Sequence, residues 1–170
     1  ASFALNADGK LAAHLPSFSE TTSVIRVGED FGVPSLTGQM TPPDDGMGAL
    51  YRGLTLGLRD YIDKNGFPGV VLGLSGGIDS AIVAALAVDA LGAERVHAVM
   101  MPSPYTSQES LDDAADLAGR LGIRLDEISI APAMQAMGDM MAPQFDGTSA
   151  DITEENIQSR LRGLIPMGIS

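Results

Sequence analysis

The side chains best suited to chemistry on a phosphate stand together in one short segment, Ser75-Gly76-Gly77-Ile78-Asp79-Ser80. Two adjacent glycines let a backbone turn approach a ligand closely and adopt a positive φ without strain. The hydroxyls of Ser75 and Ser80 flank this turn. Asp79 adds a carboxylate, which is compatible with a bound phosphate only if a cation such as Mg²⁺ neutralises the shared charge. The pattern therefore predicts a phosphate-binding turn with Asp79 as a metal ligand.

The flanking residues indicate which elements position this turn. An apolar run from Val70 to Leu74 precedes it, and a second apolar run from Ala81 to Leu91 follows it. This layout is typical of a strand, a turn and a helix. The free N–H groups at the start of such a helix, together with the helix dipole, favour an anion. The alternative interpretation is an ordinary strand-to-helix turn, in which the glycines serve geometry and a serine caps the helix.

The turn differs from the two commonest phosphate-binding motifs. It has no lysine, so it is not the Gly-x-x-x-x-Gly-Lys-Ser/Thr loop, and it lacks the Gly-x-Gly-x-x-Gly pattern of dinucleotide-binding folds. The pattern Ser-Gly-Gly-x-Asp-Ser instead resembles the PP-loop of the ATP pyrophosphatases. That resemblance implies an enzyme that binds ATP and releases pyrophosphate while it adenylates an acyl or carbonyl oxygen.

Composition excludes several classes of function. The formal net charge is −12, from 22 acidic and 10 basic residues, so a nucleic-acid surface of clustered Lys and Arg is not expected. The 170 residues include no cysteine, which removes disulfides, Cys-ligated zinc and a thiol nucleophile. The sequence has no run of 18 apolar residues and no basic-then-apolar leader, so we expect no membrane partner and a cytoplasmic location.

The first 46 residues differ in pattern from the rest of the chain. Residues 2–15 read as strand, turn and strand, with Asn6 to Gly9 supplying the turn, and a further extended piece is expected at residues 23–27. Residues 28–46 are rich in glycine and proline, which predicts a linker. Because a lone hairpin needs a sheet to join and the chain begins without Met, we expect a fragment of a longer protein.

From Met47 onward, strand and helix patterns alternate. Buried strands are expected at residues 69–74, 96–101 and 123–130, and helices at about 47–65, 80–91, 107–121, 131–141 and 151–164. Pro166 is expected to end the last helix early. This order predicts an α/β fold with a Rossmann-like parallel sheet and helices on both faces, preceded by the β-hairpin and linker. Ligands of such a sheet bind beyond the carboxyl ends of its strands, where Ser75 to Ser80 lie.

Two further segments narrow the resemblance to one family. Residues 100–110, with sequence MMPSPYTSQES, and residues 151–163, with sequence DITEENIQSRLRG, are similar to the synthetase domain of NAD synthetase, especially its glutamine-dependent form. The resemblance implies an adenine nucleotide alpha hydrolase-like fold. It also implies that residues 1–27 are the tail of a nitrilase-like glutaminase domain, residues 28–46 a linker, and residues 47–170 the N-terminal part of the synthetase domain.

The same resemblance implies a reaction and its participants. ATP, with Mg²⁺, adenylates the nicotinate carboxylate of deamido-NAD and pyrophosphate leaves; ammonia, free or derived from glutamine, then displaces AMP to give NAD. Subunits of the family assemble as homo-oligomers. By motif position, the resemblance assigns ATP binding to Gly73, Ser75, Gly76, Gly77, Ile78, Asp79, Ser80 and Gln108, with Ser75, Asp79 and Ser80 at the reaction and Asp79 on the metal. Asn156 and Arg160 are assigned to deamido-NAD.

The sequence also departs from the family. It holds no cysteine for glutamine hydrolysis, and the family continues past the segment matched here with a second metal ligand and further substrate-binding residues. We therefore expect this chain alone to bind nucleotide weakly and to turn over slowly or not at all. Two alternatives stay open: another PP-loop amidotransferase, such as a GMP or asparagine synthetase, and a nucleotide-binding fragment without catalysis.

Overall fold

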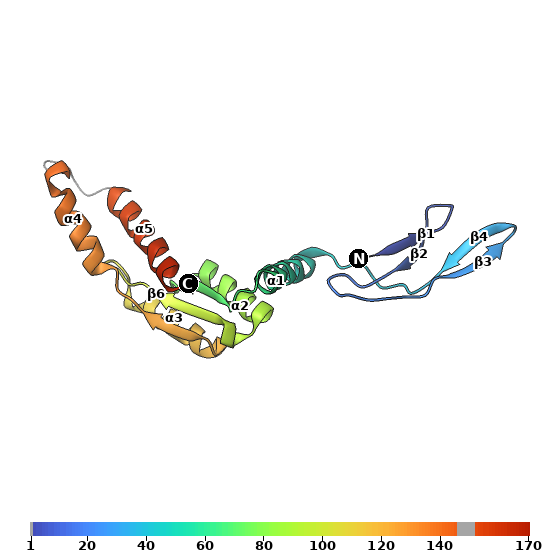
Figure 1. Ribbon diagram of the computed structural model, residues 1–170, viewed down its shortest axis with the longest axis horizontal. Helices are drawn as coiled ribbons and strands as arrows, with labels where there is room; N and C mark the ends of the chain where they lie inside the picture. The colour runs from blue at the N-terminus through green and yellow to red at the C-terminus, as the bar shows by residue number, and fades with distance from the viewer. Residues whose placement is uncertain (1, 146–151) are drawn as a thin grey trace. The chain divides into compact units, whose positions relative to one another are not determined.

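Three short apolar segments form a parallel sheet in the computed structural model of the protein, which describes residues 2–145 and 152–170 (Figure 1). The strands are β5 (Val70–Gly73), β6 (Val96–Met100) and β7 (Arg124–Glu127), hydrogen-bonded in the order β5-β6-β7. Val70 pairs with Val96, and His97 pairs with Arg124. The predicted parallel α/β fold is confirmed.

Alternation along the strands separates two apolar layers. On β6, Val96, Ala98 and Met100 join one cluster, whereas Val99 joins another cluster on the opposite face. Helices α2 (Ile78–Leu91) and α3 (Gln108–Leu121) cover the first face. On the second face, α5 (Ile152–Ile169) packs through Leu161 and Ile165, and α4 (Ala131–Phe145) adds Met134 near its start and then extends away from the sheet (Figure 1). Both crossover helices of the sheet thus lie on one face, as equal handedness of the two connections requires.

Residue choice explains the helices next to the turn. Helix α2 presents the small buried residues Ala84, Ala87 and Ala90, which let it approach the sheet closely. Helix α3 begins after Ser107, whose side chain accepts a hydrogen bond from the N–H of Ser110. A short 3-10 helix, η1 (Ala93–Arg95), connects α2 to β6.

In the parts of the chain that the structure describes, no helix combines the length and apolar composition that a membrane crossing requires.

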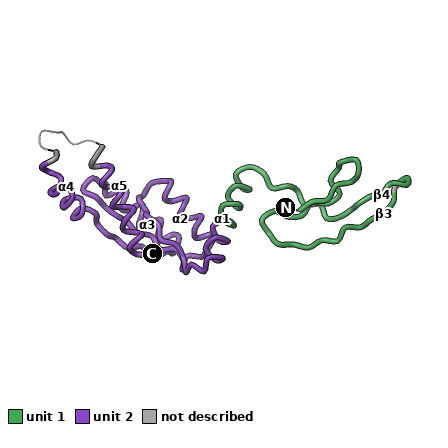
Figure 2. The backbone as a smooth tube through the Cα atoms, turned by 45° about the horizontal axis from the view of Figure 1, so that its top comes forward, with its two compact units in different colours: residues 1–57 green, residues 58–170 purple. Residues whose placement is uncertain are grey.

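The chain divides into two compact units, residues 1–57 and 58–170, with the boundary inside helix α1 (Gly46–Lys64) (Figure 2). In the first unit, β1 (Phe3–Leu5) and β2 (Leu11–His14) form the predicted antiparallel hairpin. Its turn closes through hydrogen bonds from the N–H of Asn6 to the carbonyl of Lys10 and from the N–H of Gly9 to the carbonyl of Asn6, both 2.9 Å long.

The linker expected at residues 28–46 is wrong in its first half. Strands β3 (Arg26–Asp30) and β4 (Val33–Thr37) form a second antiparallel hairpin, closed by Phe31 and Gly32, which both have positive φ. The Asn6 amide joins the two hairpins, because its Oδ1 accepts from the N–H of Leu36 at 2.7 Å. Glycine and proline therefore shape an ordered turn and an outer strand here, where composition alone suggests a loose connection.

The last two helices are longer than expected. Helix α4 continues to Phe145 with Pro143 inside it, and α5 continues to Ile169 through Pro166. Proline removes one helical donor, but Leu161 and Ile165 pack on the sheet core and hold α5 in place. The N–H of Ser170 donates to the carbonyl of Pro166 at 3.1 Å and extends the helical pattern. The predicted start of this helix at residue 151 lies outside the described residues.

Candidate nucleotide-binding site

The glycine-rich turn is anchored to the sheet and to α3. Strand β5 ends at Gly73, and the next residue, Leu74, is buried and donates its N–H to the carbonyl of Val99 at 3.0 Å. Gly76 has φ +78°, and a Cβ at this position would lie 2.3 Å from the carbonyl oxygen of Ser110. Only glycine fits at position 76, because any side chain meets both a left-handed backbone and the first turn of α3.

The two serine hydroxyls hold the shape of the turn. Ser80 Oγ accepts from the N–H of Ser75 at 3.2 Å and donates to the carbonyl of Gly77 at 2.9 Å. Because the Ser80 proton is used on that carbonyl, Ser75 Oγ donates to Ser80 Oγ across 3.1 Å. Ser75 Oγ also accepts from the N–H of Gly77 at 3.3 Å. The hydroxyls expected beside a phosphate therefore act inside the turn in this structure.

The start of α2 leaves main-chain donors exposed. Its N-cap is Gly77, which has extended backbone geometry and no side-chain hydrogen bond, so the serine cap of the alternative interpretation is wrong. The first N–H groups of a helix have no acceptor within the helix. Ile78 is 72% exposed and Asp79, in the first helical turn, is also exposed, so this end of α2 faces open solvent. The helix dipole and these amides together favour an anion at the turn.

A cavity of about 300 Å³ lies beside the turn, at the carboxyl ends of β5 and β6. Its wall includes Gly73 and Ser75 from the turn, Pro102 and Thr106 from the segment after β6, and Arg162 and Gly163 from α5. Ligands of open parallel sheets bind at this edge of the sheet. The structure thus brings together the predicted turn and both segments on which the family resemblance rests.

Sequence reasoning missed the polar group on the α5 side of this cavity. Gln158 Oε1 accepts from Arg162 Nη2 at 3.0 Å, from Arg162 Nη1 at 3.2 Å and from Ser103 Oγ at 2.8 Å. Arg162 Nε also donates to the carbonyl of Met101 at 3.4 Å. These residues lie inside the two segments that carry the family resemblance, but their orientation depends on which face of α5 meets the sheet.

The remaining predicted residues, Gln108, Asn156 and Arg160, are exposed and do not line the 300 Å³ cavity. Gln108 is the first residue of α3, is exposed, and donates from Nε2 to Asp112 Oδ1 at 2.8 Å. Asn156 and Arg160 are exposed on α5, on a different face from Leu161, which packs on the sheet. The structure therefore does not bring Asn156 and Arg160 together with the turn, and their assignment to a dinucleotide stays a prediction.

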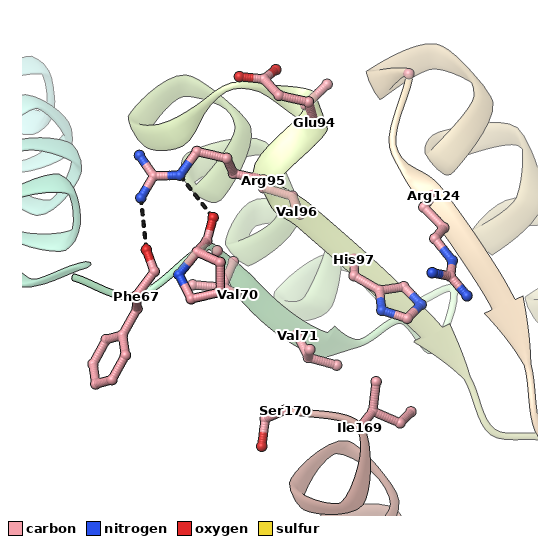
Figure 3. A pocket seen from close by; sticks show the side chains of 14 residues that line it. Phe67, Val70, Val71, Glu94, Arg95, Val96, His97, Arg124, Ile169 and Ser170 are labelled. Atoms are coloured by element: carbon pink, nitrogen blue, oxygen red, sulfur yellow. Dashed lines mark hydrogen bonds between the residues drawn. The ribbon is translucent and has the colours of Figure 1, made fainter. Parts of the chain in front are cut away.

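A second and larger cavity, of about 750 Å³, lies at the amino ends of the same strands (Figure 3). Its two arginines, Arg95 and Arg124, are already paired. Arg95 donates to the carbonyls of Phe67 and Pro68, both at 3.0 Å, and to Asp63 Oδ1 at 2.8 Å.

Arg124 and His97, which also line this cavity, form a second paired group around Asp126. Arg124 contacts both oxygens of the Asp126 carboxylate, at 3.2 and 2.5 Å, and His97 Nε2 lies 2.8 Å from Oδ2. The hydrogen bond from Arg124, with a smaller contribution from His97, lowers the pKa of Asp126 below its usual value of 3.8. Within residues 2–145 and 152–170, no three His, Asp or Glu side chains gather as a metal site.

The chain matches a known protein family over the residues that form the sheet, the glycine-rich turn and α5. The family model described as NAD synthase matches residues 50–170. The glutamine-dependent NAD(+) synthetase of Rhodobacter capsulatus is 53% identical over 173 residues, which cover 100% of this chain and 31% of that protein. The chain thus spans about a third of the length of this curated relative.

Two solved structures align with this chain over most of its length. The glutamine-dependent NAD+ synthetase of Acinetobacter baumannii, in complex with ADP, aligns with a TM-score of 0.87 and 44% identity, over 96% of this chain and 31% of its own. The NMN synthetase of Francisella tularensis aligns with a TM-score of 0.63 and 31% identity, over 74% of this chain and 50% of its own.

Proposed function

Because this chain belongs to the NAD synthase family, we propose that it carries the ATP-binding half of the active site of a glutamine-dependent NAD synthetase. The reaction is the ATP-dependent amidation of deamido-NAD. A carboxylate oxygen of the nicotinate group attacks the α-phosphorus of ATP, and the bond from that phosphorus to pyrophosphate breaks. Ammonia then attacks the acyl carbon of the adenylate, and AMP leaves as the ammonia nitrogen loses a proton. The products are NAD, AMP and pyrophosphate.

The observation that carries this proposal is the uncapped start of α2 next to a turn that admits only glycine at position 76. Such an end offers several main-chain N–H groups to the phosphates of ATP. Little covalent work is left to the protein, which must align a carboxylate with the α-phosphate and spread the charge. The solved relative that aligns over 96% of this chain contains ADP, which is the ligand chemistry that this end of α2 suits.

Asp79 is the residue that would hold Mg²⁺. Mg²⁺ in nucleotide sites is bound through one or two carboxylates together with substrate phosphates, so one exposed carboxylate beside the phosphate-binding amides fits this ion. The ion would neutralise charge on the pyrophosphate leaving group. Ser75 and Ser80 support the site by holding the turn, and Gln108 stands on the neighbouring helix end.

The first unit of the chain supports glutamine as the source of the ammonia. The synthase family model begins at residue 50, whereas the Rhodobacter relative, named as glutamine-dependent, matches the whole chain. We therefore assign residues 1–27 to the end of a glutaminase domain and residues 47–170 to the synthetase domain. Apolar side chains such as Phe3, Val24 and Val27 are 64–79% exposed in this unit, which suits a segment packed against further sheet. A homo-oligomer and a cytoplasmic location complete the proposal.

The test is an assay of pyrophosphate release by the intact protein with ATP, Mg²⁺, ammonia and one acceptor at a time. We expect release, and formation of NAD, with deamido-NAD. Xanthylate and aspartate test the other PP-loop amidotransferases, and nicotinate mononucleotide tests the activity suggested by the NMN synthetase neighbour. Release with any of these acceptors but not with deamido-NAD would overturn the proposal. Residues 1–170 alone are expected to bind nucleotide weakly and to form little NAD.

A further inference from the structure

Arg162 places a cation in the wall of the 300 Å³ cavity, which Ser75 of the glycine-rich turn also lines. Its side chain is half-buried, between the end of β6 and helix α5. The neighbouring residue Leu161 packs against the sheet core and so fixes the rotation of α5 about its axis. The guanidinium therefore has a defined place in the same cavity as Gly73 and Ser75.

Counting donors shows that this guanidinium retains hydrogen-bonding capacity. A guanidinium carries five N–H groups. One donates to the carbonyl of Met101, and one from each terminal nitrogen donates to Gln158 Oε1. Two N–H groups remain without an acceptor among the residues that the structure describes.

Arg162 also has no counter-ion among the side chains that the structure describes. Both of its partners are neutral, and none of the described carboxylates forms an ion pair with it. A half-buried cation with neutral partners is costly unless an anion approaches it. The amides at the start of α2 favour an anion at the turn, and Gly73 and Ser75 on the strand side of that turn line the same cavity as Arg162.

We propose that Arg162 is a phosphate-binding residue of the nucleotide site and that Gln158 and Ser103 position it. The guanidinium approaches the polyphosphate of ATP from the α5 side, while the glycine-rich turn binds it from the β5 side. Gln158 accepts from both terminal nitrogens and so fixes the plane of the guanidinium, and Ser103 Oγ donates to the same amide oxygen. This inference rests on the proposed function, because it takes ATP as the ligand of the cavity.

The alternative role for Arg162 is purely structural, as an anchor of α5 on β6. Affinities for ADP and for adenosine, measured on the intact protein, separate the two roles, because adenosine lacks phosphates. We expect Arg162→Gln to weaken ADP about 10- to 100-fold, the range for a lost charge-assisted hydrogen bond, and to leave adenosine affinity unchanged. Arg162→Lys keeps the charge without the planar fork and should lose less.

Two further variants complete the experiment. Gln158→Leu removes the shared acceptor and should weaken ADP by a smaller factor than Arg162→Gln, again without an effect on adenosine. Arg120→Gln is the matched control, because Arg120 is an exposed arginine on α3 that pairs with Asp116 in the same helix. It should change neither affinity.

Equal ADP affinity in the wild type and Arg162→Gln, or parallel losses for ADP and adenosine, would overturn the assignment. The wild-type assay with deamido-NAD keeps the two claims apart. If the wild type forms NAD and Arg162→Gln binds ADP normally, the inference fails and the proposed function stands.

Discussion

The two ends of the parallel sheet differ in what their polar groups are doing. At the amino ends of the strands, the larger cavity of about 750 Å³ is bordered by Arg95 and Arg124, whose guanidinium groups are paired with Asp63 and Asp126. At the carboxyl ends, the cavity of about 300 Å³ is bordered by Ser75, from the turn that leads into the uncapped start of α2, and by Arg162, which has only neutral partners among the described residues. Cavity size alone would place a ligand at the amino ends of the strands, whereas the available hydrogen-bond donors place an anionic ligand at the carboxyl ends.

The difference has a simple physical origin in the parallel arrangement. Each strand leads into a helix at its carboxyl end, so the unsatisfied N–H groups of the following helices collect at that edge. At the amino end, helices finish and their carbonyls are exposed, which attracts arginine side chains. Arg59, for example, donates from Nε to the carbonyl of Ala90 near the end of α2 at 2.7 Å. An anionic ligand is thus favoured at the carboxyl end only.

Gly76→Ala should give the largest effect. The added Cβ would lie 2.3 Å from the Ser110 carbonyl oxygen at a backbone φ of +78°. The steric clash and the left-handed backbone together cost about 2–4 kcal/mol. The turn and α3 must move apart to relieve this strain, which displaces the main-chain donors, so ADP affinity should fall at least about tenfold. Calorimetric titration with ADP measures this.

The control for this variant is Gly119→Ala. Gly119 is exposed in α3, and a methyl group added there would meet nothing within 4 Å, so ADP affinity should stay at the wild-type value. If Gly76→Ala bound ADP as tightly as Gly119→Ala, the turn would not be the phosphate site.

Arg95→Met should sharpen the comparison from the other end. The substitution removes three hydrogen bonds, to Asp63 and to the carbonyls of Phe67 and Pro68, while keeping most of the apolar stem. Because this side chain is partly exposed, we expect a loss of about 1–2 kcal/mol in the free energy of unfolding. Urea unfolding measures that loss, and ADP titration should give the wild-type affinity. A large loss of ADP affinity with normal folding would contradict the separation of the two ends.

Asp126→Asn should have the smallest effect, and one that depends on pH. The folded-state pKa of Asp126 is lowered, chiefly by Arg124, so its contribution to stability is present above the unfolded value of 3.8 and is lost as the pH falls through the lower folded value. The stability difference between wild type and variant should therefore shrink as the pH falls from about 5 to about 2.5. A difference that stays constant or grows over this range, measured by urea unfolding, would contradict the pairing.

Local sequence patterns predicted the strand, turn and helix around Ser75 to Ser80 because that information is contained in a few neighbouring residues. The Ser-Gly-Gly-x-Asp-Ser pattern, the apolar strand and the alanine-rich helix all agree with one another. The glycine pair also indicated a positive φ, which Gly76 has, but not the close neighbour Ser110, a residue 34 positions further along the chain that packs against the turn.

The second hairpin and the place of Arg162 in the cavity wall could not be predicted in the same way. Residues 28–37 have the composition of a loop, and their order depends on Asn6, which pairs with Leu36 across 30 positions. On α5, the apolar residues at 157, 161, 164 and 165 fall at helical spacing and mark one face. That pattern does not show which polar residues beside the face reach a cavity, and only the packing of Leu161 and Ile165 on the sheet places Arg162 in the cavity wall, with Gln158 bonded to it.

The most direct measurement follows the backbone amide resonances of the intact protein by NMR as ADP is added. The account predicts that the largest shifts occur at the amides of residues 76–80, where the N–H groups of the turn and of α2 meet the phosphates. Largest shifts at Val70, Val71, His97 and Arg124, around the amino-end cavity, would contradict it, as would the absence of any shift at the turn when ADP is bound.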